Sequence, residues 1–515
     1  MYSRFVCGTP AGLSAEKVFV ESDVTFGFPS FHIVGLADAA IRESKERVRS
    51  AVSHSGFSFP QERVTVNLSP ADLRKEGTHF DLPVALGILT SAGRISLSEA
   101  WRGEDWACAG ELALDGRLIR IRGLLPVLLG LKETGIRRFV LPAENLEEAR
   151  AVPEILLYPA ENLRQAADHV SGKRRIREVS SDGEAYLQKM KGREAPGFEN
   201  PDYSEVEGQE TAKRALQIAA AAMHNILMTG PPGSGKSMLA RRLPGILPPL
   251  SYDEMIEITK IYSVSGLLDP ARPLMTSRPF RSPDTKITPA ALAGGGRRPV
   301  PGEISLAHLG VLFLDEVPEF SRTALETLRG PMEEEKVSIS RTGGRFIFPA
   351  KFLTAAAMNP CPCGYASDPE RECTCSEYQI RSYRARLSGP FLDRIDLFVC
   401  VNPAQRRGER EEKEEVSSAQ LREGVMRARE IQNERFREEK INYNSQMTQR
   451  HLKRYCRLDV ETEFLLNRAC ESLRLSQRGC SRILRVARTI ADIEGADDIG
   501  FGHLAEAVAY KEIKI

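Results

Sequence analysis

Apolar residues recur along this chain with several spacings, and each spacing predicts one kind of element. Residues 38–53 (DAAIRESKERVRSAVS) repeat apolar positions every three or four residues, which predicts an amphipathic helix. Residues 63–68 (RVTVNL) alternate apolar and polar side chains, which predicts a strand with one buried face. The apolar run at 311–314 predicts a strand buried on both faces, and the apolar runs at 226–228 and 352–358 predict further strands of the same sheet. The pattern therefore indicates an α/β fold.

A glycine-rich turn follows the apolar run at 226–228. It reads GPPGSGKS and leads into helix-like residues, which is the strand, loop and helix context of a phosphate-binding P-loop. Lys236 would reach the β- and γ-phosphates of ATP, and the Ser237 hydroxyl would ligate Mg²⁺. The expected nucleotide-binding residues are Gly230, Pro231, Pro232, Gly233, Ser234, Gly235, Lys236, Ser237 and Met238.

Two acidic residues, Asp315 and Glu316, directly follow the apolar run at 311–314. Asp315 would complete the Mg²⁺ shell together with Ser237, and Glu316 would polarise the attacking water. An ordinary pair of acids at a strand end is the alternative, and the P-loop earlier in the chain argues against it. From about residue 200 onward, the sequence therefore predicts an ATPase that uses ATP and Mg²⁺.

Composition adds limits to this picture. The 515 residues exceed the size of one typical domain, and 71 Lys plus Arg against 70 Asp plus Glu give no overall charge bias towards nucleic acid. No window approaches the roughly 18 uninterrupted apolar residues of a transmembrane helix. We expect a soluble, cytoplasmic protein without a membrane segment, in which any DNA contact comes from a local basic patch.

Four of the ten cysteines cluster in one short segment. Cys361, Cys363, Cys373 and Cys375 form a C-x-C-x9-C-x-C pattern, and four thiolates suit a structural, tetrahedral Zn²⁺ site. The pairs are spaced more tightly than the usual C-x2-C, and free thiols on a surface loop are the alternative. The sequence leaves both interpretations open.

The chain divides by composition into four parts. Residues 1–168 mix strand-like and helix-like pieces without an evident catalytic group, and the polar residues 169–201 predict a linker. Residues 202–405 contain the P-loop and the acids. Residues 406–515 begin with a charged run and then predict helices over 417–440 and 460–510.

Two segments of the first part resemble a known protease domain. Residues 74–89 (RKEGTHFDLPVALGIL) and 109–150 are similar to the proteolytic domain of Lon-type ATP-dependent proteases. The resemblance implies an α+β domain, with the serine position at His79 and the lysine position at Leu125. Leucine cannot take a proton from a nucleophile, so we expect the fold without the protease activity.

The order of the parts resembles one family over essentially the whole chain. A Lon-like domain, the element Glu207, Gly208, Gln209, Glu210 before an alanine-rich helix, the P-loop and a helical tail are similar to the ComM/YifB family of magnesium-chelatase-like ATPases. The resemblance implies an AAA+ P-loop core, an all-helical lid and a ring of identical subunits, expected to be a hexamer.

The resemblance also implies roles for individual residues. Asn359, after the run 352–358, matches the first sensor, which orients the lytic water or senses the γ-phosphate. Arg394, within SGPFLDRIDL, matches an arginine finger offered to the nucleotide of a neighbouring subunit. Arg478 matches the second sensor best, and Arg482 and Arg485 remain close competitors.

A basic hairpin is the expected DNA contact. The sequence KVSISRTGGRFIFPAKF resembles the hairpin before the first sensor of helicase-like AAA+ proteins, and Arg341, Arg345 and Lys351 are candidates for gripping phosphates. A solvated basic turn is the alternative. The family implies branched-DNA helicase activity in recombination of incoming DNA during natural transformation. The rivals are a chelatase-like or protein-remodelling motor, an ATP-dependent protease and a scaffold that only binds ATP.

Overall fold

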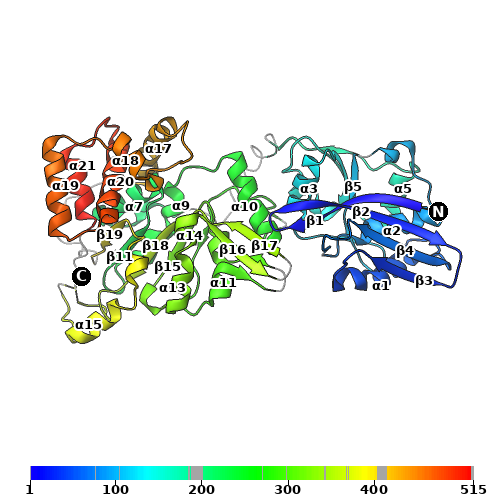
Figure 1. Cartoon of the computed structure of the whole chain (residues 1–515), viewed down its shortest axis with the longest axis horizontal. Helices are drawn as coiled ribbons and strands as arrows, with labels where there is room; N and C mark the ends of the chain where they lie inside the picture. Colours follow the sequence, from blue (N-terminus) through cyan, green and yellow to red (C-terminus); the bar gives the residue numbers. More distant parts are fainter. Residues whose placement is uncertain are drawn as a thin grey trace. The chain divides into compact units, whose positions relative to one another are not determined.

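The computed structural model divides the chain into two compact units. The first unit contains Met1–Glu194, Ser251–Thr276 and Ser338–Phe348, and the second contains Ala195–Leu250, Ser277–Val337 and Pro349–Ile515. The described residues are 2–75, 77–103, 105–183, 186, 201–269, 271–296, 299–341, 344–366, 368, 370–402 and 415–511. Each unit has its own sheets, and both are drawn in Figure 1.

The first unit opens with a sheet of strand order β1-β2-β4-β3, in which only the β3–β4 pair is parallel. Its strands are β1 (Tyr2–Ala11), β2 (Ser14–Thr25), β3 (Ser30–Val34) and β4 (Arg63–Ser69). Helix α1 (Ala39–His54) begins where Asp38 accepts a hydrogen bond from the backbone N–H of Ile41, which is an N-cap. The helix predicted over 38–53 and the strand predicted over 63–68 are confirmed.

A second sheet of the first unit has the order β10-β9-β8-β5. Its strands are β5 (Trp106–Cys108), β8 (Arg138–Pro142), β9 (Leu156–Ala160) and β10 (Val179–Ser180). The unit also contains the short hairpin β6 (Glu111–Leu112) and β7 (Leu118–Ile119) and the helices α2 (Asp81–Ser91), α3 (Leu124–Glu133), α4 (Leu146–Ala149) and α5 (Leu163–Val170).

Helix α10 (Tyr252–Ser265) joins the first unit although its sequence lies after the P-loop. It packs against α3. Ser263 of α10 donates a 2.5 Å hydrogen bond to the buried carboxylate of Glu148. Of the range 202–405 predicted as the ATPase core, residues 251–276 and 338–348 group with the first unit, and the domain bounds themselves stay a prediction.

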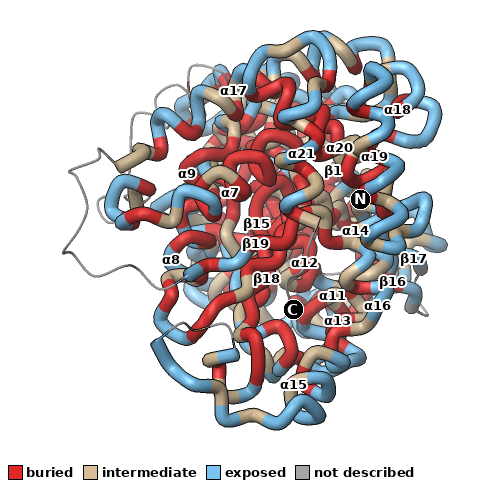
Figure 2. Tube along the Cα trace, turned by 90° about the vertical axis from the view of Figure 1, so that its left-hand side faces the viewer, coloured by how far each residue is buried: buried red, intermediate tan, exposed pale blue. Residues whose placement is uncertain are grey.

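The second unit is built on a five-stranded, all-parallel sheet of order β12-β15-β18-β11-β19. Its strands are β11 (Ile226–Thr229), β12 (Phe280–Arg281), β15 (Val311–Leu314), β18 (Leu353–Met358) and β19 (Leu397–Cys400). Strands β15 and β18 are buried throughout, and Figure 2 shows them in red beneath helices with pale blue outer turns. Because the strands are parallel, the loops after β11, β15 and β18 emerge at one edge of the sheet.

Helices surround this sheet and form the end of the chain. They are α7 (Glu210–Ala222), α8 (Lys236–Arg241), α9 (Leu243–Ile246), α17 (Ser418–Arg435), α18 (Gln449–Tyr455), α19 (Val460–Ser472), α20 (Gln477–Glu494) and α21 (Phe501–Ala509). Helix α17 packs on α7 and α20. The prediction of an α/β core with a helical C-terminal region is confirmed. The helices predicted over 460–510 are confirmed as α19, α20 and α21, and Gly495, with a left-handed φ of 73°, ends α20.

The segment between β12 and β18 carries shorter elements. They are α11 (Pro289–Ala293), β13 (Gly294–Gly295), β14 (Val300–Pro301), α12 (Glu303–Leu306), α13 (Arg322–Leu328), α14 (Pro331–Glu334), and the hairpin β16 (Lys336–Arg341) and β17 (Gly344–Pro349). A disulfide joins Cys470 of α19 to Cys480 of α20. Among the described residues, we find no helix with the length and apolar character needed to cross a bilayer.

Candidate active site

The loop from Gly230 to Gly235 has the backbone that a phosphate cradle needs. Gly233 and Gly235 have φ values of 78° and 90°, a region that side chains other than glycine rarely adopt. A Cβ on Gly230 would lie 2.1 Å from the carbonyl oxygen of Val401, so only glycine fits there. The loop joins β11 to α8, as the sequence predicted.

Lys236 is folded back onto its own loop. Its Nζ donates to the carbonyl oxygens of Gly230 at 2.7 Å and Pro231 at 2.8 Å, and it lies 3.3 Å from Oδ1 of Asn359. The side chain is buried, and burial lowers the pKa of Lys236, opposed by the negative charges of Asp315 and Glu316. A bound phosphate would favour the charged ammonium further and would compete with the two carbonyls for it.

Ser237 and Asp315 meet across the ends of two strands that are separated by β18. The Ser237 hydroxyl donates a 2.6 Å hydrogen bond to Oδ2 of Asp315. A hydroxyl and a carboxylate oxygen are the kinds of ligand that Mg²⁺ accepts alongside water and phosphate oxygens. The residues present therefore fit an ATP-bound Mg²⁺ ion, as predicted from the two motifs.

Glu316 directly follows Asp315 but has a different environment. Its side chain is exposed and makes no hydrogen bond to the part of the chain that the structure describes. Its φ of 49° is left-handed, which is uncommon for a residue with a side chain. A cavity of about 450 Å³ opens beside it, lined by Glu316, Glu319, Asn359, Pro362, Tyr378, Gln379, Ser382, Tyr383 and Arg386. This cavity brings Glu316 and Asn359 to a common wall.

Arg394 also belongs to the second unit, but its contacts are with residues outside the P-loop. Its guanidinium forms a 2.7 Å ion pair with Glu333 and donates to the carbonyl oxygens of Pro390 at 2.6 Å and Arg329 at 3.2 Å. The side chain is 14% exposed, and none of these partners belongs to the P-loop. Its predicted role across a subunit boundary stays a prediction.

The three arginines considered for the second sensor differ in their contacts. Arg478 is exposed in the first turn of α20. Arg482 is buried and donates to the carbonyl oxygen of Ile395 at 3.1 Å and to Asp393 at 3.5 Å. Nε of Arg485 finds no hydrogen-bond partner among the described residues, and burial lowers the pKa of this arginine. Arg478 is therefore the most exposed of the three, and its role as the second sensor stays a prediction.

Sequence reasoning missed a buried polar network at the other end of the sheet. Asn225 donates from Nδ2 to the carbonyl oxygen of Arg394 at 2.9 Å, and its backbone N–H donates to Asp396 at 3.2 Å. His224 lies between Asp396 at 3.3 Å and Thr489 of α20 at 3.0 Å. Burial alone would raise the pKa of Asp396, but the hydrogen bond with His224 and nearby cations hold it below its usual range. The only signal of this network in the sequence was a polar residue directly before each of two strands, Asn225 before β11 and Asp396 before β19.

The predicted DNA-binding residues divide into three cases. Arg345 is exposed on β17, and its guanidinium lies 3.4 Å from the Ser338 hydroxyl. Lys351 is half-buried, with its ammonium 4.6 Å from the centre of the Tyr443 ring, a cation–π contact. The side chain of Arg341 lies outside the described residues. Arg345 is the candidate best exposed for contact with a nucleic acid.

The Lon-like positions of the first unit lack the groups of a serine–lysine dyad. Leu125 is fully buried, and only its backbone N–H reaches a polar partner, Glu148 at 3.4 Å. His79 is also buried, with Nε2 2.8 Å from the carbonyl oxygen of Gly8. Asp81 lies in the first turn of α2 and pairs with Arg47 at 2.8 Å.

Family models for magnesium chelatase cover most of the chain. A model described as magnesium chelatase, subunit ChlI, matches residues 202–409. A second, described as subunit ChlI of Mg-chelatase, matches 20–145, and a third, for the ChlI C-terminal region, matches 415–511.

Several known proteins are similar to the chain over different lengths. Competence protein ComM of Haemophilus influenzae is 40% identical over 99% of this chain and 97% of that protein, and YifB of Escherichia coli is 38% identical over 98% and 95%. A Lon protease of Chloroflexus aurantiacus is 28% identical over 28% of this chain and 18% of its own length. The magnesium-chelatase 67 kDa subunit of Chlorobaculum parvum is 26% identical over 31% of this chain and 23% of its own length.

The family models and the near full-length relatives agree with a P-loop and acid pair on a parallel sheet, and the chain therefore belongs to the ComM/YifB family of magnesium-chelatase-like AAA+ ATPases.

Proposed function

We propose that this protein is a ring-forming AAA+ ATPase that uses ATP hydrolysis to remodel DNA. Within that function, we propose branch migration during recombination of incoming DNA in natural transformation. The observation that carries the ATPase is the 2.6 Å contact between Ser237 and Asp315, which unites the P-loop and the acid pair in one site. The competence protein ComM of Haemophilus influenzae, with its near full-length similarity, supports the biological setting.

Each residue of the site has a separate task in this proposal. Lys236 would exchange its carbonyl partners for the β- and γ-phosphate oxygens, and Ser237 with Asp315 would hold Mg²⁺, which neutralises charge on the phosphates. Glu316, with no hydrogen-bond partner among the described residues, is available to take a proton from the attacking water. Asn359 lies beside Lys236 and at the same cavity as Glu316, where its amide would orient that water.

The ring is proposed because Arg394, the match for an arginine finger, contacts Glu333, Pro390 and Arg329 and no residue of the P-loop in its own protomer. We propose that Arg394 leaves its ion pair with the half-exposed Glu333 and contacts the nucleotide of the next subunit. The number of subunits, expected to be six, is tested by light scattering with ATP and Mg²⁺ present. A protein that stays monomeric while hydrolysing ATP at full rate would contradict the ring.

Stimulation by DNA tests the substrate. Phosphate release is measured with no DNA, with single-stranded DNA, with duplex DNA and with a four-way junction, at low salt. The proposal expects the junction or the single strand to raise the turnover several-fold, with Lys236→Ala as the inactive control. If no form of DNA raises the turnover, the result favours a second candidate function, a chelatase-like or protein-remodelling motor. The partial similarity to a magnesium-chelatase subunit supports this candidate.

The basic hairpin makes the DNA proposal testable at one residue. Arg345→Ala should weaken DNA binding uniformly across sequences and reduce the slope of log affinity against log salt by about 1, because one phosphate contact is lost. The matched control is Lys336→Ala at the base of the same hairpin, where Lys336 lies 3.6 Å from Glu334. Equal effects of the two substitutions would contradict a specific contact at Arg345.

Proteolysis is the least supported alternative, because Leu125 is a buried leucine with no proton-accepting group. ATP-dependent degradation of casein by the purified protein would support proteolysis.

Zinc is a third expected cofactor, with a structural role, because four cysteine ligands leave no open coordination position. The proposed compartment is the cytoplasm, where thiols such as the four free ones of the cluster remain reduced, and the Cys470–Cys480 disulfide is the exception to this pattern.

A further inference from the structure

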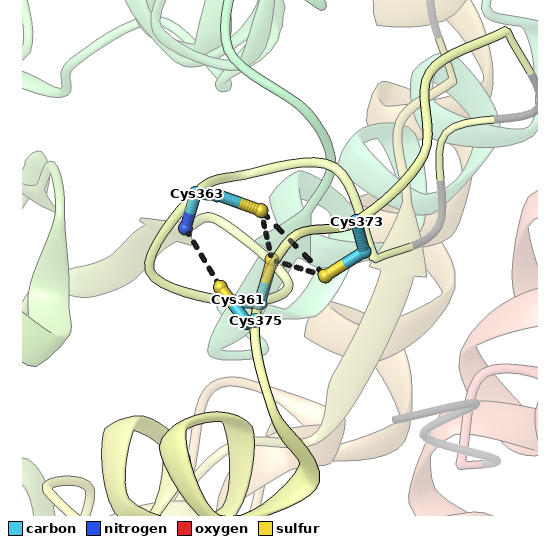
Figure 3. A group of neighbouring side chains, drawn as sticks. All are labelled: Cys361, Cys363, Cys373 and Cys375. Carbon is cyan, nitrogen blue, oxygen red and sulfur yellow. Dashed lines mark hydrogen bonds between the residues drawn. The ribbon is translucent and has the colours of Figure 1, made fainter.

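Four cysteine sulfurs converge in the segment between β18 and α15 (Glu377–Arg384). The Sγ atom of Cys361 lies 3.3 Å from that of Cys363 and 3.6 Å from that of Cys373, and Cys363 and Cys373 are 3.6 Å apart. Cys375 completes the group, and all four Sγ atoms lie within 4.8 Å of one another. The Sγ atom of Cys375 accepts a hydrogen bond from the backbone N–H of Cys363 at 3.4 Å. Figure 3 shows the four side chains pointing to a common centre.

These separations match one tetrahedral metal ion. Zinc–thiolate bonds of about 2.3 Å place the sulfurs of a tetrahedron roughly 3.8 Å apart. A disulfide would bring two of the sulfurs to about 2.05 Å, and all four thiols are free. An iron–sulfur cluster would hold its cysteines on separate corners and so farther apart than a single ion does. Zinc is therefore the metal that this sulfur set favours.

The segment has little else to hold it. Its described residues from Pro360 to Cys375 form no helix or strand, and Glu370, Arg371 and Glu372 are exposed. Cys361 is the only one of the four cysteines that is buried. A loop of this length without an apolar core needs a cross-link to stay ordered, and a bound ion provides one.

The same segment lies against the nucleotide site. Gly364 has a φ of 90°, and a Cβ on it would lie 2.5 Å from Cδ of Pro232 in the P-loop, so its backbone packs directly on that proline. The guanidinium of Arg384 in α15 donates to the carbonyl oxygen of Pro360 at 3.1 and 3.2 Å. The segment begins directly after Asn359 and ends in the helix whose Tyr383 lines the cavity beside Glu316.

We propose that Cys361, Cys363, Cys373 and Cys375 bind one Zn²⁺ as thiolates, and that the closed loop holds the P-loop and the cavity wall in their working positions. The metal is structural and touches neither nucleotide nor water. Loss of zinc should therefore weaken ATP binding and slow turnover, although no group that contacts ATP has been removed. This second part rests on the proposed ATPase, whereas the metal content does not.

The metal is tested on the full-length protein purified without added zinc or chelator. Elemental analysis should find one zinc per chain, and Co²⁺ substitution should give the intense charge-transfer absorption of a thiolate site. The double variant Cys363→Ser/Cys375→Ser should lose the metal, whereas Cys400→Ser, an exposed cysteine outside the cluster, should keep it. A protein that contains no zinc and takes none up on titration overturns the site, as does zinc retained by the double variant.

Two further measurements keep the proposal testable if the double variant does not fold. In the wild-type protein, titration of the thiols with an organomercurial should release the zinc in step with modification of the cluster cysteines. Gly364→Ala keeps all four ligands and should bind zinc normally, yet its ATP affinity should fall roughly tenfold, because the new methyl group meets Pro232. Gly135→Ala, at a glycine with a φ of 92° and open space around the added carbon, is the matched control. Normal ATP affinity in Gly364→Ala overturns the positioning role while leaving the zinc result intact.

Discussion

Glu316 offers the sharpest test of the site, because two substitutions there separate the catalytic role of its side chain from the strain of its left-handed backbone. Replacement by glutamine removes the proton acceptor, and general-base catalysis contributes about 10² to 10⁴ in rate, or roughly 3 to 5 kcal/mol of barrier. ATP binding should stay within about twofold of wild type, because the exposed carboxylate hydrogen-bonds to none of the described residues. Phosphate release and binding of a fluorescent ATP analogue measure the two effects.

Replacement by glycine separates stability from catalysis at the same position. A left-handed φ costs a non-glycine residue about 1 to 2 kcal/mol, and Glu316 has a φ of 49°. Glycine removes that strain but loses roughly 0.5 to 1 kcal/mol through its freedom in the unfolded chain. Glu316→Gly should therefore fold with a stability within about 1 kcal/mol of wild type while hydrolysis falls as in Glu316→Gln.

The matched control is Glu319, which lines the same cavity and pairs with Arg386 at 2.7 Å. Both partners are about half exposed, and such pairs contribute roughly 0 to 1 kcal/mol, so Glu319→Gln should change turnover by less than about fivefold. Unchanged turnover in Glu316→Gln, or an equal loss in Glu319→Gln, would refute the assignment of the base.

Three further results are expected. Lys236→Ala should weaken ATP binding roughly a hundredfold, measured with a fluorescent ATP analogue, because a charged phosphate contact is lost; normal binding would contradict the cradle. Arg394→Ala should lose turnover and recover part of it when mixed with Lys236→Ala subunits, and no recovery would count against action between subunits. His169 is buried among both tryptophans of the chain, and burial lowers its pKa to about 4 from 6.5. A lowered folded-state pKa favours the neutral imidazole. The contribution of His169 to the free energy of unfolding is therefore full above pH 6.5, and about 3 kcal/mol of it is lost as the pH falls towards 4. Tryptophan fluorescence should report this loss in wild type, and its persistence in His169→Asn would refute the assignment.

The sequence predicted the second unit well where short-range signals decide the structure. Buried strands such as β15 are apolar runs, and the P-loop and acids directly follow such runs, so both could be found from local order alone. The φ of Glu316 could not be predicted, because nothing in the residue type favours a left-handed backbone there. The cysteine spacing left zinc open until the fold brought the sulfurs within 4.8 Å of one another.

Features that depend on distant contacts were out of reach. Helix α10 begins with a Ser251 capping box like many helices, and it belongs to the first unit through its packing on α3 and the hydrogen bond from Ser263 to Glu148. The ion pair of Arg394 with Glu333 joins residues from separate elements, and no local pattern marks either as the partner of the other. Tertiary packing decides such cases, and periodicity carries no information about it.

The position of Arg394 relative to β11 limits what it can do. Its carbonyl oxygen accepts a hydrogen bond from Asn225, which directly precedes β11, whereas the P-loop begins at Gly230 beyond the other end of that strand. Five residue steps of a parallel strand span about 16 Å, at roughly 3.3 Å each. An arginine side chain is much shorter than this span, and that of Arg394 is held at Glu333. If Arg394 stabilises a transferring phosphate, that phosphate must be bound by another protomer. Catalysis through Arg394 therefore requires assembly into an oligomer.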